Sequence, residues 1–138
     1  MKAELVRFGV SLEKQLRDNF DTLIRERKYT NRSEALRDLI RRALVQRTWG
    51  KGGDVAGAIT LIYDHHHRDV LTNVTDIQHD FQKIIVSTQH IHLDHNNCLE
   101  IIATRGKAEE VQQLADALTS IKGVRHGTLG MSSTGREI

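Results

Sequence analysis

Three histidines and the only cysteine of the chain lie within nine positions, in the stretch HIHLDHNNC from His90 to Cys98. Imidazole and thiolate groups favour divalent transition metals, whereas magnesium and calcium prefer oxygen ligands. A lone cysteine cannot close an intramolecular disulfide, so we interpret Cys98 as a thiolate ligand in a reducing compartment. The stretch therefore predicts a metal site.

The spacing within this stretch brings the donors together. His90 and His92 are two residues apart on a predicted strand, so both side chains project from one face. The turn DHNN follows, and Cys98 begins the next strand roughly opposite His92. His79, near the end of the preceding helix, completes the pattern H-x10-H-x-H-x5-C. The run HHH at 65–67 is either a surface cluster or a secondary metal site, and ligand types alone make tetrahedral zinc the default metal.

The region around this stretch alternates between strand and helix patterns. We expect strands over 58–63, 84–93, 98–105 and 126–131, and helices over 66–81 and 108–121. The order βαββαβ is the split motif of ferredoxin-like domains. The metal site would therefore sit on the hairpin between the second and third strands.

The start of the chain has a different pattern. Apolar residues alternate over 6–12, which predicts one short strand, and an apolar stripe predicts a helix over 13–27. A second helix begins after Asn31 as N-cap, with Glu34 as the reciprocal partner of a capping box. One strand cannot form a sheet alone, so two chains are expected to pair their strands antiparallel. The whole chain is thus predicted to be an α+β protein.

Charge divides the chain at the glycine-rich segment WGKGGD. Residues 1–49 hold 12 lysines and arginines against 7 acidic residues, and residues 50–138 hold 8 against 11. We predict a DNA-binding domain over 1–48, a linker over 49–54 and a metal-binding domain over 55–138. A basic first domain suits an anionic partner, although an ordinary solvated surface has the same balance.

Two domains of this size each bury only a modest core, so oligomerisation is expected. No apolar run approaches the length that crosses a bilayer, which predicts a cytoplasmic protein with no membrane partner.

A two-stranded ribbon would present the polar face of 6–12 from both chains on a surface narrow enough for the DNA major groove. Arg7 can bond a guanine edge there. The N-terminus of the second helix directs backbone N–H groups outward and can hold a phosphate. The residues expected to contact double-stranded DNA are Arg7, Gly9, Ser11, Asn31, Arg32 and Ser33.

Residues 7–44 resemble the ribbon-helix-helix (βαα) DNA-binding domain, in the order of strand, two helices and the NRSE cap. With the βαββαβ unit and its histidine and cysteine spacing, the whole chain resembles the nickel-responsive transcriptional regulator family. The resemblance implies a ferredoxin-like domain of the ACT type. It also implies one nickel ion per subunit, held in square-planar geometry by His90, His92 and Cys98 and by His79 from a neighbouring subunit. The family spacing extends to His65, a candidate secondary metal ligand.

The resemblance further implies a homotetramer, a dimer of dimers, that represses nickel-uptake genes when nickel is bound. Two ribbon dimers predict an operator with two symmetric half-sites. Relatives also hold a cation between the domains with carboxylates that match Glu34 and Asp38, although a capping box and a favourable helix first turn explain both residues equally well. Gly9 departs from the small hydroxyl residue that relatives often have in the ribbon.

Two other classes of function are compatible with these residues. A zinc or copper metalloenzyme would use three protein ligands and an open water position, but no positioned general base is evident, so we do not expect an enzyme. A ribbon-helix-helix regulator that senses another ligand would bind DNA without dependence on metal.

Overall fold

A computed structural model describes residues 2–138, and the chain divides into two compact units between Ile40 and Arg41. The first unit holds α1 (Lys14–Glu26) and the start of α2 (Arg32–Gly50). Both helices agree with the predicted positions. None of the helices found between residues 2 and 138 carries an apolar stretch that could cross a membrane.

The predicted strand over 6–12 does not form within the single chain. Residues 2–13 are neither helix nor strand, and the side chains of Leu5, Val6 and Phe8 are 87%, 77% and 74% exposed. A strand needs a hydrogen-bonded neighbour, and residues 14–40 consist of the two helices and the turn between them, which supply none. Pairing between two chains therefore stays a prediction.

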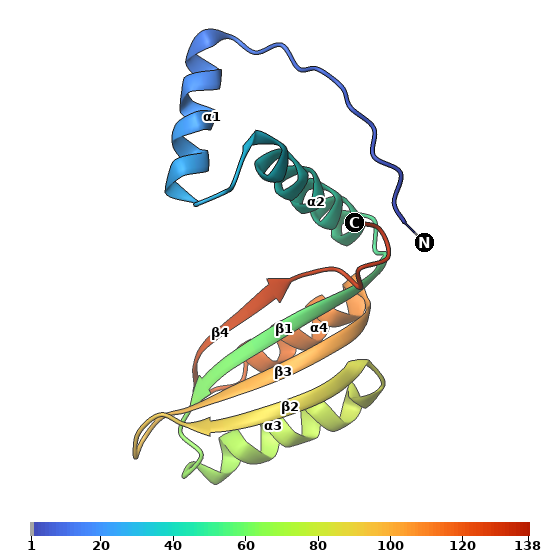
Figure 1. Ribbon diagram of the computed structural model, residues 1–138. Helices are drawn as coiled ribbons and strands as arrows, with labels where there is room; N and C mark the ends of the chain where they lie inside the picture. Colours follow the sequence, from blue (N-terminus) through green and yellow to red (C-terminus); the bar gives the residue numbers. More distant parts are fainter. Residues whose placement is uncertain (1) are drawn as a thin grey trace. The chain divides into compact units, whose positions relative to one another are not determined.

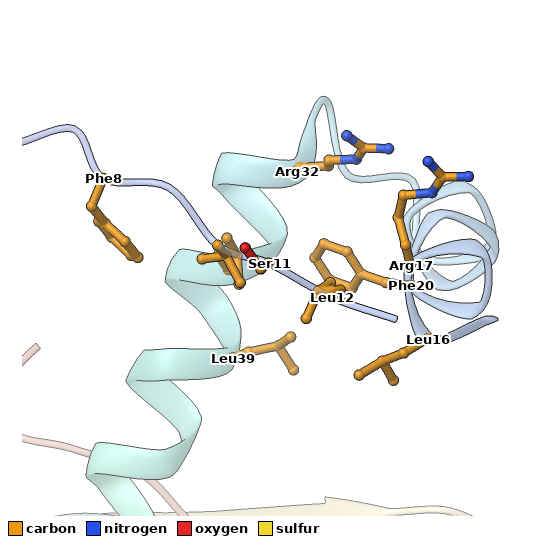
Figure 2. Close-up of a pocket in the computed structure, with 10 residues that line it drawn as sticks. Phe8, Ser11, Leu12, Leu16, Arg17, Phe20, Arg32 and Leu39 are labelled. Atoms are coloured by element: carbon orange, nitrogen blue, oxygen red, sulfur yellow. The ribbon is translucent and has the colours of Figure 1, made fainter. Parts of the chain in front are cut away.

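The two helices and the extended segment of the first unit line an open apolar groove. Figure 2 shows side chains from all three segments facing the same space, with the guanidinium groups of Arg17 and Arg32 at its rim. The apolar residues that line the groove are Phe8, Val10, Leu12, Leu16, Phe20, Leu36 and Leu39. A surface of this kind is usually covered by another protein surface.

The start of α2 follows its predicted cap. The side-chain oxygen of Asn31 accepts a hydrogen bond from the backbone N–H of Glu34 at 2.9 Å, which satisfies one of the free donors of the first turn. A capping box also requires the Glu34 side chain to bond the backbone N–H of the N-cap residue. The Glu34 carboxylate instead forms an ion pair with Arg37. Arg32 forms a two-pronged ion pair with Asp21 of α1, at 2.9 and 2.8 Å, which joins the two helices.

The second unit is the predicted βαββαβ fold (Figure 1). Its elements are β1 (Asp54–Tyr63), α3 (Arg68–Asp80), the 3-10 turn η1 (Gln82–Ile84), β2 (Ile85–His92), β3 (Cys98–Lys107), α4 (Ala108–Thr119) and β4 (Val124–Met131). The strands form one antiparallel sheet in the order β2-β3-β1-β4.

The core of the second unit lies between one face of the sheet and the helices α3 and α4 (Figure 1). Alternate residues of β1 are buried, and Ile59 and Leu61 are fully enclosed with Leu114 and Leu118 of α4. This is the period-2 pattern of a strand with one covered face meeting the apolar stripe of a helix.

The helix α2 continues through Trp49 and Gly50, and β1 begins at Asp54, so only residues 51–53 separate the two elements. The backbone N–H of Gly53 donates to the carbonyl oxygen of Thr48 at 3.0 Å. A Cβ atom at Gly53 would lie 2.8 Å from the Thr48 side chain, which favours glycine at this tight turn.

Replacing the cap, Asn31→Ala, is expected to lower the free energy of unfolding by about 1 kcal/mol, because the first turn of α2 loses its acceptor. Urea denaturation followed by helical circular dichroism measures this. Asn31→Ser keeps an acceptor oxygen and is expected to stay within a few tenths of a kcal/mol of wild type. Equal stability of the two variants would contradict the cap.

Candidate metal centre

The metal-ligand stretch folds as the predicted hairpin between β2 and β3. His92 pairs directly with Cys98, and His90 pairs with Glu100. The turn is closed by Leu93 N–H donating to the Asn97 carbonyl at 3.0 Å. The predicted placement of Cys98 opposite His92 is confirmed. All four paired side chains lie on the face of the sheet that α3 and α4 cover, because Cys98 and Glu100 are buried.

A third histidine joins the hairpin pair within the same chain. Ligand nitrogens of His65, His90 and His92 lie within 4.8 Å of one another. The ring of His65 lies edge-on to the other two, with centroid distances of 5.9 Å to His90 and 4.7 Å to His92. His65 belongs to the loop after β1, which ends beside the hairpin because Tyr63 pairs with Cys98.

His65 carries the clearest sign of a missing partner. Its Nδ1 atom is buried and makes no hydrogen bond to another described residue. Burial lowers the pKa of His65 below its usual value, so the ring is neutral at neutral pH. A neutral imidazole with an unpaired buried nitrogen is the form that binds a metal ion.

Cys98 lies beside this group, fully buried, and its thiol donates to the Tyr63 carbonyl at 2.9 Å. Burial raises the pKa of the Cys98 thiol. In the metal-free protein the thiol is therefore protonated at neutral pH, and a metal ion that takes the sulfur as ligand must displace that proton.

A buried carboxylate, that of Glu100, contacts one of the hairpin histidines. Glu100 accepts a hydrogen bond from the Tyr63 hydroxyl at 2.9 Å and another from the Gln78 amide of α3. Its Oε1 atom lies 3.4 Å from Nδ1 of His90. A carboxylate facing Nδ1 favours the proton on that nitrogen and leaves Nε2 of His90 free for a metal.

The loop that carries His65 is also fixed. The Asp64 carboxylate accepts hydrogen bonds from the backbone N–H of His66 at 3.0 Å and from its ring at 2.9 Å. These bonds lower the pKa of Asp64. The ring of His95, in the turn of the hairpin, lies 4.9 Å from the ring of His66.

His79 stands apart from the other predicted ligands. It is exposed near the end of α3 and is not a member of any ligand group within residues 2–138 of one chain. The single chain thus brings together His65, His90 and His92, with Cys98 adjacent, and leaves His79 on an outer surface.

The donor set fits a transition metal. Three imidazoles with one thiol beside them are borderline-to-soft ligands, and the unpaired Nδ1 of His65 is a position that a metal ion would satisfy. Sequence reasoning missed Glu100. The available signal is its place between Cys98 and Ile102 on the inward positions of an otherwise apolar strand.

The residues predicted to contact DNA lie in the first unit. Arg7, Gly9 and Ser11 are exposed on the extended segment, and Asn31, Arg32 and Ser33 are exposed at the start of α2. The side chain of Arg32 is held by Asp21, and Asn31 serves as the cap. At the predicted interdomain cation site, Glu34 pairs with Arg37 and Asp38 accepts a hydrogen bond from the Tyr29 hydroxyl.

Two family models match separate segments of the chain. Residues 6–47 match the model of ribbon-helix-helix proteins of the copG family, and residues 56–132 match the NikR C terminal nickel binding domain. A solved structure of an uncharacterized protein from Thermotoga maritima shares the fold over 56% of this chain and 96% of its own, with a TM-score of 0.52 and 15% identity.

Relatives match over nearly the whole chain. A protein of Syntrophus aciditrophicus is 57% identical over 134 residues, which are 97% of this chain and 98% of the relative. One from Chlorobium limicola is 56% identical over 133 residues (96% and 99%), and one from Pyrococcus furiosus is 50% identical over 135 residues (97% and 98%). All three are provisionally named nickel-responsive regulators.

Fold and donor set define a two-unit protein with a ribbon-helix-helix segment followed by a metal-binding domain of ferredoxin-like topology. More specifically, the chain belongs to the family of nickel-responsive regulators.

Nickel affinity is expected to rise steadily between about pH 5 and pH 8, because histidine must be neutral and the thiol must ionise on binding. Since burial raises the pKa of Cys98, a proton is released throughout this range. Competition titrations at several pH values measure the effect. In Cys98→Ala the rise should level off once the histidines are neutral, above about pH 7. An affinity independent of pH would rule out this ligand set.

Proposed function

We propose that this protein is a nickel-dependent DNA-binding regulator that represses nickel-uptake genes when nickel is bound. The observation that carries this proposal is the placement of His90 and His92 beside Cys98 on one hairpin, inside the segment that matches a nickel-binding domain. The same chain supplies a segment that matches DNA-binding proteins. The protein is proposed to act in the cytoplasm and to be a regulator rather than an enzyme.

The proposed nickel ligands are His90, His92 and Cys98 of one subunit and His79 of the partner subunit, one ion per subunit. The exposure of His79 at the surface of α3 supports this, because a residue outside its own chain's cluster can reach a neighbouring one. Such a set of three imidazoles and one thiolate suits square-planar nickel. His65, with its unpaired Nδ1, is the proposed ligand of a secondary metal site.

The proposed assembly is a homotetramer, a dimer of dimers. Within each dimer, two copies of residues 6–12 pair as an antiparallel ribbon, which would cover the apolar groove of the first unit. The ribbon would then present Arg7, Gly9 and Ser11 to the major groove, while the start of α2 holds a phosphate. Two ribbons on one tetramer call for an operator with two symmetric half-sites.

Regulation follows from linkage between the two kinds of site. If the nickel-bound arrangement of the protein fits DNA better, then DNA tightens nickel binding by the same factor. A second cation between the domains, on Glu34 and Asp38, would belong to the DNA-bound arrangement. Both carboxylates already have side-chain partners in the first unit, and these contacts would have to give way.

The decisive test is operator binding with added nickel, zinc, copper or no metal, measured by fluorescence anisotropy. Nickel is expected to raise the affinity most, and Arg7→Ala is expected to abolish specific binding while leaving nickel affinity nearly unchanged. Specific binding of equal strength without metal would favour a regulator of another ligand. Full-strength binding by Arg7→Ala would reject the ribbon as the reading element.

The source of His79 can be tested by mixing two variants. His79→Ala and Cys98→Ala should each lack a complete nickel site and lose the thiolate-to-nickel absorption of the intact site. If His79 comes from the partner subunit, mixed oligomers contain some sites with both an intact His79 and an intact Cys98, and tight nickel binding with its absorption band returns. No recovery, with subunit exchange verified by mass spectrometry, would reject the ligand from a neighbouring subunit.

A further inference from the structure

The end of α2 is attached to the sheet by the last segment of the chain. Trp49, the only tryptophan, packs against the core of the second unit, and its indole N–H donates to the Ser132 carbonyl at 2.9 Å. The backbone N–H of Ser132 in turn donates to the Ala56 carbonyl at 2.9 Å, one residue beyond the paired part of β4. A continuous line of contacts therefore runs from α2 through Ser132 to the start of β1.

A second set of contacts lies one residue earlier in the helix. The Thr48 hydroxyl lies within hydrogen-bond distance of two acceptors, the Leu44 carbonyl at 3.1 Å and the carboxylate of Glu137, which share its single proton. The N–H of Gly53 closes onto the Thr48 carbonyl, and the N–H of Ala108 at the start of α4 donates to the Gly53 carbonyl at 2.9 Å. The short turn between α2 and β1 is thus bonded on both sides and has little freedom.

The strand that starts at this attachment ends at the metal centre. β1 pairs with β3 on one side and with β4 on the other over most of its length, so it cannot shift alone. Its last residue, Tyr63, accepts the hydrogen bond of the Cys98 thiol and donates one to Glu100. Across its ten residues, at about 3.3 Å of rise per residue, β1 joins the two regions directly.

We propose that Trp49 and residues 132–137 form a clamp that holds the end of α2 on β1, so that the metal state of the second unit is passed into α2. The proposal rests on the nickel-dependent DNA binding proposed above. Trp49 is then a positioning residue: it is not among the proposed nickel ligands or the residues expected at DNA, and it acts through α2, which begins at Arg32. A loose connection at this point would let α2 move independently of β1, and the metal state would then not reach the helix.

The test uses the full chain, Trp49→Phe, a chain that stops after Met131, and the control Arg136→Ala, which changes an exposed residue of the same segment. In Trp49→Phe the nickel-induced gain in operator affinity is expected to fall about fivefold, because the indole hydrogen bond to Ser132 is lost. In the shortened chain the gain is expected to fall further. Nickel affinity, the thiolate absorption band and metal-free DNA binding should stay at wild-type values in all variants. Arg136→Ala should behave as wild type.

Tryptophan fluorescence reports on the clamp itself, because Trp49 is the only source. Emission should shift to longer wavelength in the shortened chain, as the indole loses its partner and meets water, and should not shift in Arg136→Ala. Unchanged emission in the shortened chain would overturn the clamp. A shifted emission with an intact nickel-induced gain would overturn its role in transmission. A wild-type protein with no nickel-induced gain would instead overturn the proposed function, with the emission shift still showing the clamp.

Discussion

The pairing of His92 with Cys98 across the hairpin of β2 and β3 is the contact on which the metal centre depends. A slip of one residue in this register would turn both histidines of β2 to the opposite face of the sheet. The turn residues hold it, since Asp94 accepts hydrogen bonds from the backbone of Asn96 and the side chain of Asn97. Because β3 also pairs with β1, the same register brings His65 to the site.

The centre is supported by polar groups that are costly to bury unless they are bonded. Glu100 is only 8% exposed, and its carboxylate has partners from β1, β2 and α3. A buried carboxylate with three partners restricts each of them, because a missing bond leaves a charge unsatisfied. The Gln78 amide donates to Glu100, and Gln78 directly precedes His79 in α3. The hydrogen bond therefore fixes the part of α3 that carries the proposed ligand His79.

The two units differ in how complete they are as single chains. The second unit encloses its own apolar core, whereas Ala35 is the one buried apolar residue among residues 2–40. Apolar side chains of residues 5–12 remain largely exposed, and the predicted strand has no partner to bond. The fold of the second unit is therefore complete within one chain, while the proposed ribbon of the first unit would need a second chain. This division would make DNA binding sensitive to how subunits are arranged.

The sequence by itself determined the local features. Periodicity identified the βαββαβ order, the turn residues identified the hairpin, and Asn31 identified the start of α2, because each depends on neighbours within a few positions. It also identified the family, from the spacing of histidines and cysteine. Apolar alternation over 6–12 predicts a strand, but a strand forms only where a neighbouring strand supplies hydrogen bonds, and the alternation does not specify that neighbour.

Only the tertiary structure showed which distant groups meet. Glu100 lies 37 positions from Tyr63 along the chain, and the two bond only because β1 and β3 pair in one register. The same pairing sets His65 beside the hairpin with an unpaired Nδ1. Arg32, at the start of α2, forms an ion pair with Asp21 of α1, eleven positions earlier in the chain. Spacing along the chain does not encode such contacts, since they depend on the register and packing of separate elements.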